Sequence, residues 1–289
     1  MKVLITGSGG QLGRELLRQL EKTSIEAVGY DIPEFDITDK AAIEKIIAAE
    51  KPEIIVSCGA MTNVDGCETN REAAMKINGE GPKNLAEIAR DRGIKMVHVS
   101  TDYVFDGDGI RENGTLRPYV ESDPIAPRTV YGESKALGEK YVAEILDQYF
   151  IVRTAWLYGD GHNFVKTMLG LADKYPEITV VNDQIGSPTS TVDLAKAIIA
   201  LMQTENYGLY HGTCEGQCSW YDFAVEIFKQ KGIEISVKPV TSEEYVSKTP
   251  RPKYSVLENR GLETLGLNTF RPWKESLTEY LAWLADNDN

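Results

Sequence analysis

The chain has 289 residues, of which 42% are hydrophobic and 26% are charged, and its 31 Lys and Arg against 44 Asp and Glu give a formal net charge of −13. A chain of this length can bury a sizeable core, and it predicts roughly two domains or one core with a smaller lobe. The acidic balance disfavours binding to nucleic acid, which requires a basic surface that neutralises phosphates. No apolar run approaches the roughly 20 residues of a membrane helix, and the apolar start is too short for a signal sequence. We therefore expect a soluble, cytoplasmic protein that binds neither nucleic acid nor a membrane.

The four cysteines, Cys58, Cys67, Cys214 and Cys218, are scattered along the chain. A chain that can build a large core does not need disulfide bonds, so a disulfide framework is not expected. The spacing of Cys214 and Cys218 is compatible with metal ligation, but no second pair of Cys or His stands beside them. Buried thiols are therefore the favoured interpretation.

Short β-branched runs alternate with longer amphipathic stretches in the first half of the chain. We predict strands at 2–5, 26–30, 53–57, 95–100 and 149–153. Helices are predicted at 10–22, 38–50, 70–92 and 131–147, the second with Thr38 or Asp39 as its N-cap. Such alternation is typical of βαβ units, whose right-handed crossovers produce a doubly wound parallel sheet.

The pattern loosens after residue 153. We predict helices at 163–174, 192–202, 220–231 and 273–285, strands at 178–181, 206–213 and 235–240, and a loop at 182–189. The predicted fold class is α/β, with a Rossmann-like doubly wound parallel sheet and a smaller C-terminal α/β lobe that binds substrate. Residues 1–159 form the sheet domain, to which 188–204 return, and 160–187 together with 205–289 form the smaller lobe. Because ligands of open α/β sheets bind outside the carboxyl ends of the strands, a lobe over that edge closes a cleft.

A glycine-rich loop, Thr6-Gly7-Ser8-Gly9-Gly10-Gln11-Leu12-Gly13, follows the first predicted strand and opens the first helix. Gly7 allows the tight turn, Gly10 lets the backbone approach a pyrophosphate, and Gly13 lets helix and strand pack closely. The N-terminus of the helix offers unpaired N–H groups and the positive end of its dipole. The position of the loop, with an acidic residue roughly 20 residues further on, predicts an NAD(P)-binding domain rather than a simple turn.

Asp31 ends the second predicted strand and is the acidic residue that this motif requires. Its carboxylate can accept hydrogen bonds from the adenosine ribose, and no Arg follows it to receive a 2′-phosphate, which favours NADH. The alternative is that Asp31 only forms a turn before Pro33. Asp36 and Ile37 lie in a second loop that could border the adenine.

Thr101 ends the fourth predicted strand, and Tyr131 and Lys135 lie four residues apart at the start of a helix. Residues at this spacing share one helical face. A phenol has a pKa of about 10, and a nearby ammonium group stabilises the phenolate that remains after proton donation. Thr101 could donate a hydrogen bond to the same carbonyl oxygen. The alternative is an ordinary amphipathic helix, but the glycine loop and Thr101 favour a catalytic set.

These motifs together resemble the extended short-chain dehydrogenase/reductase family and, within it, the family of dTDP-4-dehydrorhamnose reductases. Four further segments carry the closer resemblance: residues 100–107 (STDYVFDG), 153–159 (RTAWLYG), 163–168 (NFVKTM) and 182–189 (NDQIGSPT). The resemblance covers nearly the whole chain. It implies that hydride from NADH or NADPH reduces the C4 keto group of dTDP-4-dehydro-L-rhamnose, giving dTDP-L-rhamnose for cell-surface polysaccharide.

The resemblance also implies a role for individual positions. Cofactor contacts would come from Gly7, Gly10, Gln11, Leu12 and Gly13 at the diphosphate, from Asp31, Asp36 and Ile37 at the adenosine, from Gly59, Ala60 and Met61 beneath the cofactor, and from Tyr131 and Lys135. Tyr131 would be the acid, with Lys135 as its partner. Thr101, Asp102, Tyr131 and Trp156 would contact the sugar. Arg251 would clamp the diphosphate or nucleotide, with a plain surface arginine as the alternative.

Two departures from related proteins bear on the reaction. Nucleotide-sugar dehydratases of the superfamily carry Glu where this chain has Tyr103, so the acid that eliminates water is missing, which favours simple reduction. Some members of the family that the chain resembles hold magnesium with carboxylates and form dimers. Glu15 and Asp193 would contribute here, but Trp283 stands where a third carboxylate is expected. We therefore predict no metal and leave a homodimer open.

Three other functions remain compatible with the same fold. A non-catalytic subunit resembling the regulatory subunit of methionine adenosyltransferase would bind a partner without turnover. A nucleotide-sugar epimerase would retain tightly bound NAD through each cycle. A reductase of another nucleotide sugar would share the cofactor and differ only in its substrate.

Overall fold

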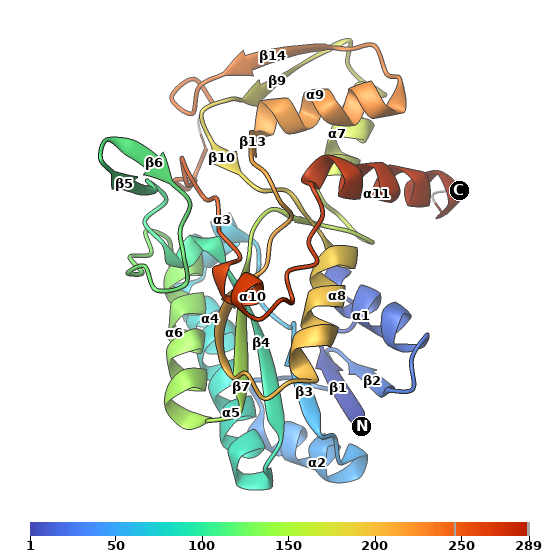
Figure 1. Cartoon of the computed structure of the whole chain (residues 1–289), viewed down its shortest axis with the longest axis vertical. Coiled ribbons are helices and arrows are strands. Elements are labelled where there is room, and N and C mark those ends of the chain that lie inside the picture. Colours follow the sequence, from blue (N-terminus) through green and yellow to red (C-terminus); the bar gives the residue numbers. More distant parts are fainter. Residues whose placement is uncertain (246, 288–289) are drawn as a thin grey trace.

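A six-stranded parallel sheet forms the centre of the computed structural model, which describes residues 1–245 and 247–287 (Figure 1). Its strands are β1 (Lys2–Thr6), β2 (Glu26–Tyr30), β3 (Ile54–Ser57), β4 (Lys95–Thr101), β7 (Tyr149–Thr154) and β12 (Gly208–His211). Their order across the sheet is β2-β1-β3-β4-β7-β12. Both the parallel sheet and the positions of its first five strands confirm the prediction.

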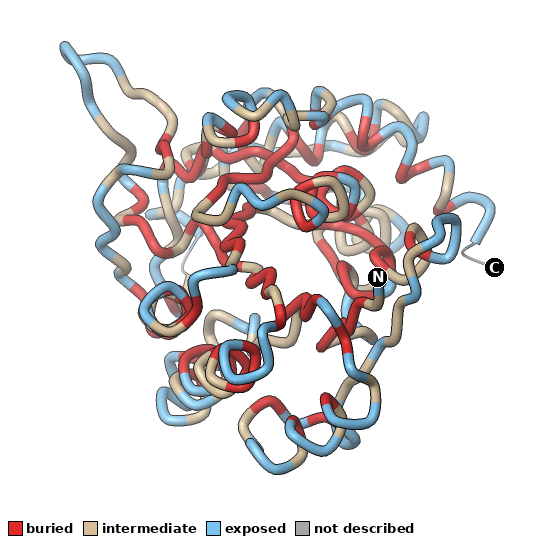
Figure 2. The backbone as a smooth tube through the Cα atoms, turned by 60° about the horizontal axis from the view of Figure 1, so that its bottom comes forward, coloured by how far each residue is buried: buried red, intermediate tan, exposed pale blue. Residues whose placement is uncertain are grey.

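Helices cover both faces of the sheet because successive strand residues point to opposite sides. Val3 and Ile5 pack with α1 (Gln11–Leu20) and α8 (Thr191–Met202), whereas Leu4 packs with α2 (Lys40–Glu50), α5 (Gly81–Arg92) and α6 (Val130–Ile145). Figure 2 shows the buried residues gathered along the strands and on the inward faces of these helices. None of the helices in the described part of the chain has the length and apolar character that a membrane crossing requires.

Strand β12 corrects the predicted lobe boundary at residue 205. Gly208–His211 pairs in parallel with Phe150–Arg153 of β7 and so belongs to the central sheet, not to the smaller lobe. The pairing joins residues about 60 apart in sequence, and a local pattern of alternation cannot distinguish an edge strand of one sheet from a strand of another.

The predicted helix at 70–92 is interrupted. The structure has α3 (Val64–Thr69), α4 (Arg71–Met75), a π-helical turn (Lys76–Glu80) and then α5. Inside the π turn, Asn78 is fully buried: its amide donates to the carbonyl of Met61 (2.9 Å) and to Ser134 Oγ (3.0 Å). The extra residue in this turn therefore serves to tie the segment after β3 to α6.

The smaller lobe lies beyond the carboxyl ends of the strands (Figure 1). Its helices are α7 (Phe164–Ala172), α9 (Trp220–Lys231) and α11 (Trp273–Asn287), and its strands pair as β9 (Glu177–Val181) with β14 (Ser236–Val240) and β10 (Ile185–Gly186) with β13 (Cys218–Ser219). The pair β8 (Leu157–Tyr158) and β11 (Thr189–Ser190) links it to the sheet. The remaining elements are a 3-10 turn (Asp102–Val104), the hairpin β5 (Ile110–Glu112) and β6 (Thr115–Arg117), and α10 (Arg260–Thr264).

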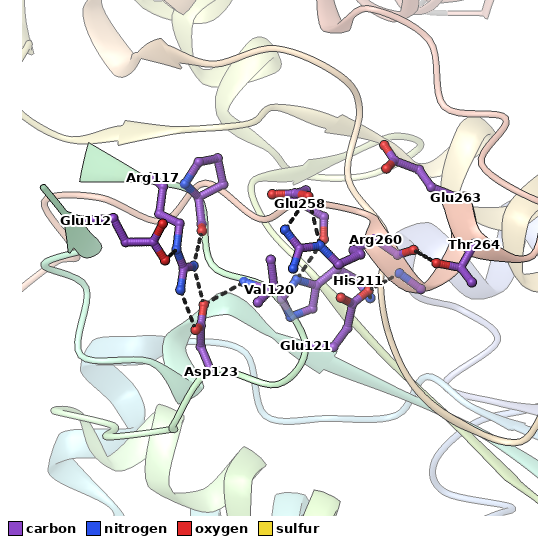
Figure 3. Close-up of polar contacts among 12 residues, drawn as sticks. Glu112, Arg117, Val120, Glu121, Asp123, His211, Glu258, Arg260, Glu263 and Thr264 are labelled. Carbon is purple, nitrogen blue, oxygen red and sulfur yellow. Dashed lines mark hydrogen bonds and ion pairs between the residues drawn. The ribbon is translucent and has the colours of Figure 1, made fainter. Parts of the chain in front are cut away.

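A segment that leaves the smaller lobe crosses back over the sheet domain. Tyr254 N–H donates to the carbonyl of Gly107 (2.8 Å), and Tyr119 N–H donates to the carbonyl of Val256 (2.9 Å). Figure 3 shows the polar contacts beside this crossing, where Glu121 Oε1 accepts the N–H of His211 (3.1 Å). In the same view Arg117 contacts Asp123 with two nitrogens, at 2.7 and 2.8 Å. The two main-chain hydrogen bonds hold the C-terminal segment against the loop that follows Thr101, and Glu121 ties that loop to β12.

An ion pair between α6 and β7 is buried beneath this segment. Arg153 Nε and Nη2 contact the two carboxylate oxygens of Glu139 at 2.9 and 2.7 Å, and both side chains are less than 10% exposed. The guanidinium also lies 5.0 Å from the centre of the Phe105 ring. Since the pair is excluded from water, each charge depends on the other for solvation.

We expect Arg153→Met to lower the free energy of unfolding by about 3–5 kcal/mol, because it leaves Glu139 as a buried charge without its partner. Urea denaturation measures the change. Arg71→Met is the matched control, since Arg71 pairs with Glu133 on the same helix α6 at the surface, and it should cost less than about 1 kcal/mol. Equal losses in the two variants would contradict a buried, interdependent pair.

Candidate active site

The strand order reverses between β1 and β3, and the backbones after these strands touch. A Cβ atom added to Gly7 would lie 2.6 Å from the nitrogen of Gly59. Gly7 has φ +64°, a conformation that side chains other than glycine rarely adopt. A ligand-binding crevice is expected at this point, because the loops that follow the two strands separate to opposite faces of the sheet.

The glycine loop has the geometry of a dinucleotide cradle. Gly10 N–H donates to the carbonyl of Gly7 (3.0 Å), and Gly10 is the N-cap of α1. A Cβ atom at Gly13 would lie 2.4 Å from the carbonyl oxygen of Gly7, so only glycine allows the helix to pack this closely. The first turn of α1 lines the cleft, and the N–H groups at the start of a helix have no partners within that helix.

A cleft of about 580 Å³ runs from this loop to the ends of β4 and β7. Most of the predicted site residues line it, namely Gly7, Gly10, Gln11, Leu12, Gly13, Asp31, Gly59, Ala60, Thr101, Asp102, Tyr131, Lys135 and Trp156. They come from segments as far apart as residues 7 and 156. The structure thus places these residues around a single cleft, although they are distant from one another in the sequence.

Asp31 does more than form a turn before Pro33. Its Oδ2 accepts the N–H of Gly9 (2.9 Å) and its Oδ1 accepts the N–H of Ile32 (2.8 Å). The carboxylate therefore joins the end of β2 to the glycine loop while it faces the cleft. This is the position from which a carboxylate reaches a ribose hydroxyl in dinucleotide-binding sheets.

The start of α6 places Tyr131 beside Thr101. Thr129 caps the helix by accepting the N–H of Gly132 (3.0 Å), and a Cβ atom at Gly132 would lie 2.2 Å from the carbonyl oxygen of Tyr103. Glycine here lets the helix approach the turn after β4. The rings of Tyr103 and Tyr131 then meet edge to face, with centroids 5.4 Å apart.

Burial controls the proton affinity of the two titratable groups among the catalytic candidates, Tyr131 and Lys135. Burial raises the pKa of Tyr131, and a hydrogen bond with Thr101 partly offsets that effect. Lys135 donates to the carbonyl of Val99 (2.7 Å), and burial lowers its pKa to about 8. At pH 7 Tyr131 therefore keeps its proton, and most of Lys135 is an ammonium group.

Asp102 is a buried carboxyl group in the same wall. Thr101 Oγ1 lies 2.8 Å from Asp102 Oδ1 and also accepts the N–H of Tyr103 (3.2 Å). Burial raises the pKa of Asp102 to about 7, against hydrogen bonds from Thr101 and Ser255 that lower it. The hydroxyl of Thr101 thus lies between this carboxyl group and Tyr131.

A second cavity of about 700 Å³ adjoins the cleft, and Asp102, Tyr103 and Trp156 line both. Its walls include aromatic and aliphatic side chains of the smaller lobe together with Arg251 and Lys248. Arg251 pairs with Asp65 of α3 (3.0 Å) and lies 3.5 Å from the hydroxyl of Tyr103. Arg251 therefore lies in the wall of the second cavity and contacts the sheet domain through Asp65.

A family model described as RmlD substrate binding domain matches residues 1–285. The chain belongs to this family. The spore coat polysaccharide biosynthesis protein SpsK of Bacillus subtilis is 45% identical and aligns over 97% of this chain and 96% of its own. The crystal structure of a dTDP-4-dehydrorhamnose reductase from Clostridium acetobutylicum is 48% identical, with a TM-score of 0.95, over 99% of this chain and 100% of its own. The enzyme of that name from Bacillus anthracis, solved with NADP, is 40% identical, with a TM-score of 0.92, over 98% and 99% of the two chains.

Membership of the RmlD family confirms the resemblance that the motifs carried. Three predicted cofactor contacts are nevertheless absent from the described lining of the cleft: Asp36, Ile37 and Met61. Asp36 is exposed and accepts the N–H of Thr38 (2.8 Å), and Ile37 is buried in the core. The backbone of Met61 is hydrogen-bonded to Asn78. Their contacts with a cofactor remain predictions.

Two residues at the site, Arg14 and Trp220, were not among those predicted from the sequence. Arg14 reaches the mouth of the cleft from α1, and Trp220 of α9 lines the second cavity. Arg14 could have been noticed as a basic residue one position after the last motif glycine. Trp220 could not, because it approaches Trp156 only through the tertiary fold.

The carboxylates considered for magnesium have protein partners. Arg271 contacts both oxygens of Asp193 (2.8 and 2.9 Å), and Ser276 donates to one of them (2.6 Å). Glu15 pairs with Arg18, and its carboxylate accepts a hydrogen bond from Gln19.

The two cysteines that were considered for metal ligation, Cys214 and Cys218, are buried free thiols, and burial raises the pKa of each. No cluster suited to a metal ion occurs among residues 1–245 and 247–287.

We expect Asp102→Asn to stabilise the protein above pH 7 and to have little effect near pH 4. The folded state holds this proton up to about pH 7, whereas an unfolded Asp releases it near 3.8. Stability therefore falls as pH rises between these values, by up to about 4 kcal/mol, and an amide does not titrate. Urea denaturation at pH 4.5 and pH 8 measures the difference.

Asp123→Asn is the control, because the pKa of Asp123 is shifted in the opposite direction from that of Asp102. Hydrogen bonds from Arg117 lower the pKa of Asp123, so this carboxylate contributes stability above its unfolded pKa that is lost as pH falls. Both pH values lie above the unfolded pKa of about 3.8, so the Asn variant should be destabilised by nearly the same amount at pH 8 and at pH 4.5. If Asp102→Asn changed the free energy of unfolding by the same amount at pH 4.5 and pH 8, Asp102 would not titrate between these two pH values.

Proposed function

We propose that this protein is an NAD(P)H-dependent reductase of the C4 keto group of a dTDP-linked 4-keto-6-deoxy sugar, with dTDP-4-dehydro-L-rhamnose as its substrate. One observation carries the proposal. A dinucleotide cradle and the set Thr101, Tyr131 and Lys135 lie at the two ends of one cleft, and this cleft opens at Trp156 into a second cavity. The names of the RmlD family members support the same reaction.

The residues present fit a nicotinamide dinucleotide. Gly7 and Gly13 allow the tight loop, because a Cβ atom at either would clash with neighbouring backbone atoms, and the first N–H groups of α1 suit a diphosphate. Asp31 would accept hydrogen bonds from the adenosine ribose. Arg14, also at the cleft, would supply positive charge near the phosphates. When bound in reduced form, the cofactor supplies the hydride.

The chain's own residues supply the proton and stabilise the charge that develops on the carbonyl oxygen. Tyr131 donates its phenolic proton to that oxygen as the C4 carbon gains hydride, so that the ketone becomes an alcohol. The ammonium of Lys135 stabilises the remaining phenolate, and Thr101 donates a hydrogen bond at the same oxygen. Thr101 and Lys135 are buried and Tyr131 is partly buried, so water screens these interactions only weakly.

The second cavity suits the nucleotide part of the substrate. Arg251 and Lys248 give its wall positive charge in a chain whose net charge is −13, and a guanidinium can bind a diphosphate with two nitrogens. Aromatic side chains of the smaller lobe offer surfaces for stacking. The product would be dTDP-L-rhamnose, consistent with a relative named for polysaccharide biosynthesis.

We expect Tyr131→Phe to lower kcat by about 10²–10⁴-fold, because it removes the proton donor and leaves the glycine loop intact. The measurement is the loss of NADPH or NADH absorbance after dTDP-4-dehydro-L-rhamnose is added. Calorimetry should find an unchanged Kd for the cofactor. Tyr141→Phe is the control, since it makes the same atomic change about three turns further along α6.

Equal turnover in the wild type and Tyr131→Phe would rule out this catalytic assignment. Absence of turnover in the wild type, together with stoichiometric capture of a partner protein, would favour the non-catalytic subunit. Tightly bound NAD in the purified protein and interconversion of sugar epimers would favour an epimerase.

We expect the wild type to prefer NADH and Asp31→Ala to shift the ratio of kcat/KM for NADPH over NADH upward by about tenfold. The substitution removes charged hydrogen bonds to the ribose and the repulsion of a 2′-phosphate. Glu34→Ala removes a nearby exposed carboxylate and should leave the ratio unchanged. A wild type that strongly prefers NADPH, or an unchanged ratio in Asp31→Ala, would contradict this role of Asp31.

A further inference from the structure

Trp156 occupies the junction of the two cavities in an uncommon backbone conformation. It lines both the cleft that contains Tyr131 and the cavity that contains Arg251. Its φ is +49°, in the left-handed region that bulky residues rarely adopt. Such a conformation costs roughly 1–2 kcal/mol and persists only where surrounding contacts impose it.

Two contacts hold the indole of Trp156. The ring of Trp220 stacks on it almost in parallel, with centroids 3.5 Å apart and an angle of 7° between the planes. Gly186 lies against the same ring, since a Cβ atom there would be 2.4 Å from Cε2 and 2.6 Å from Nε1. The main chain is held as well, because the carbonyl of Trp156 accepts the N–H of Thr189 (3.1 Å).

Both contacts originate in one two-stranded sheet of the smaller lobe. Gly186 ends β10, which pairs with β13, and Trp220 follows β13 directly as the first residue of α9. Trp220 is itself packed against Phe164, with centroids 4.5 Å apart, and Phe164 stacks on Phe223 in the lobe core. The orientation of Trp156 is therefore set by the core of the smaller lobe and not by the sheet domain that carries it.

We propose that Trp220 and Gly186 are positioning residues that hold the indole of Trp156 flat at the junction of the two cavities, so that the sugar of a nucleotide sugar meets Tyr131 in one orientation. The inference rests on the proposed function, because it assumes a substrate that extends from one cavity into the other. A sugar between a bound nucleotide and the cleft must pass this ring. A misplacement of about 1 Å at a reacting carbon lowers the rate by about 10²-fold, so a fixed wall has catalytic value.

The test compares Gly186→Ala, Trp220→Leu and Trp220→Phe with the wild type. Gly186→Ala adds a methyl group that displaces the indole, and Trp220→Leu removes the stacked ring. We expect each to raise KM for dTDP-4-dehydro-L-rhamnose and to lower kcat/KM by about 10- to 100-fold. Trp220→Phe retains an aromatic face and should lose less than about threefold. The product of the two impaired variants should contain a larger share of the C4 epimer, measured by NMR.

Two controls separate positioning from general stability. Trp283→Leu removes another aromatic residue of the smaller lobe, one that stacks on Tyr280 outside both cavities, and its kinetic constants should equal those of the wild type. The Kd for NADPH should be unchanged in all four variants. Wild-type KM and epimer ratio in both Gly186→Ala and Trp220→Leu would overturn the proposal, as would a parallel loss of cofactor binding.

If the proposed reductase function is wrong, the experiment gives a result that differs from both outcomes above. In that case the wild type itself would not oxidise NADPH or NADH with this sugar. Calorimetric titration with dTDP-L-rhamnose then tests the positioning role alone: weaker binding by Gly186→Ala and Trp220→Leu than by the wild type and Trp283→Leu supports it, and equal or absent binding in all of them overturns it.

Discussion

The close approach of the backbone after β1 to the backbone after β3 is the constraint on which the rest of the site depends. Gly7 approaches Gly59 so closely that a Cβ atom on Gly7 is excluded, and Gly13 brings α1 onto the same loop. Because β1 and β3 are neighbours whose connections run to opposite faces of the sheet, this contact opens a crevice instead of closing one. The N-terminus of α1, Asp31 and the end of β4 then all face the same space.

Desolvation determines the chemistry at the other end of the cleft. Lys135 and Asp102 are buried and Tyr131 is partly buried, and desolvation shifts the pKa of each group in favour of its uncharged form. The phenol keeps its proton, the ammonium remains mostly charged at neutral pH, and the carboxyl group titrates near neutrality. Removing three neighbouring ionisable groups from most of their contact with water lowers the stability of the fold, and this cost is typical of a site arranged for proton transfer.

The smaller lobe contributes more than a cover over the cleft. Its C-terminal segment crosses the sheet domain, is held there by main-chain hydrogen bonds, and delivers Arg251 to Asp65 of α3. Its β10–β13 sheet sets the orientation of Trp156, which belongs to the link between the domains. Both the sheet domain and the smaller lobe therefore determine the geometry of the site, and residues of both line the space that the substrate would occupy.

Local patterns were sufficient for the features that depend on neighbouring residues. The alternation of strand and helix, the N-cap at Asp39, the glycine loop and the spacing of Tyr131 and Lys135 all follow from short-range sterics and periodicity, and the structure has each of them. The resemblance carried by longer motifs indicated the family, and the family model confirmed it.

Only the tertiary structure decided the features that join distant segments. It placed β12 in the central sheet, interrupted the helix at 70–92 with a π turn around Asn78, and stacked Trp220 on Trp156. These outcomes depend on packing between residues tens of positions apart, and periodicity within one segment contains no information about its partner. The sequence by itself determined the fold class and the chemical groups of the site, whereas the relative placement of those groups arose from long-range contacts between the two parts of the chain.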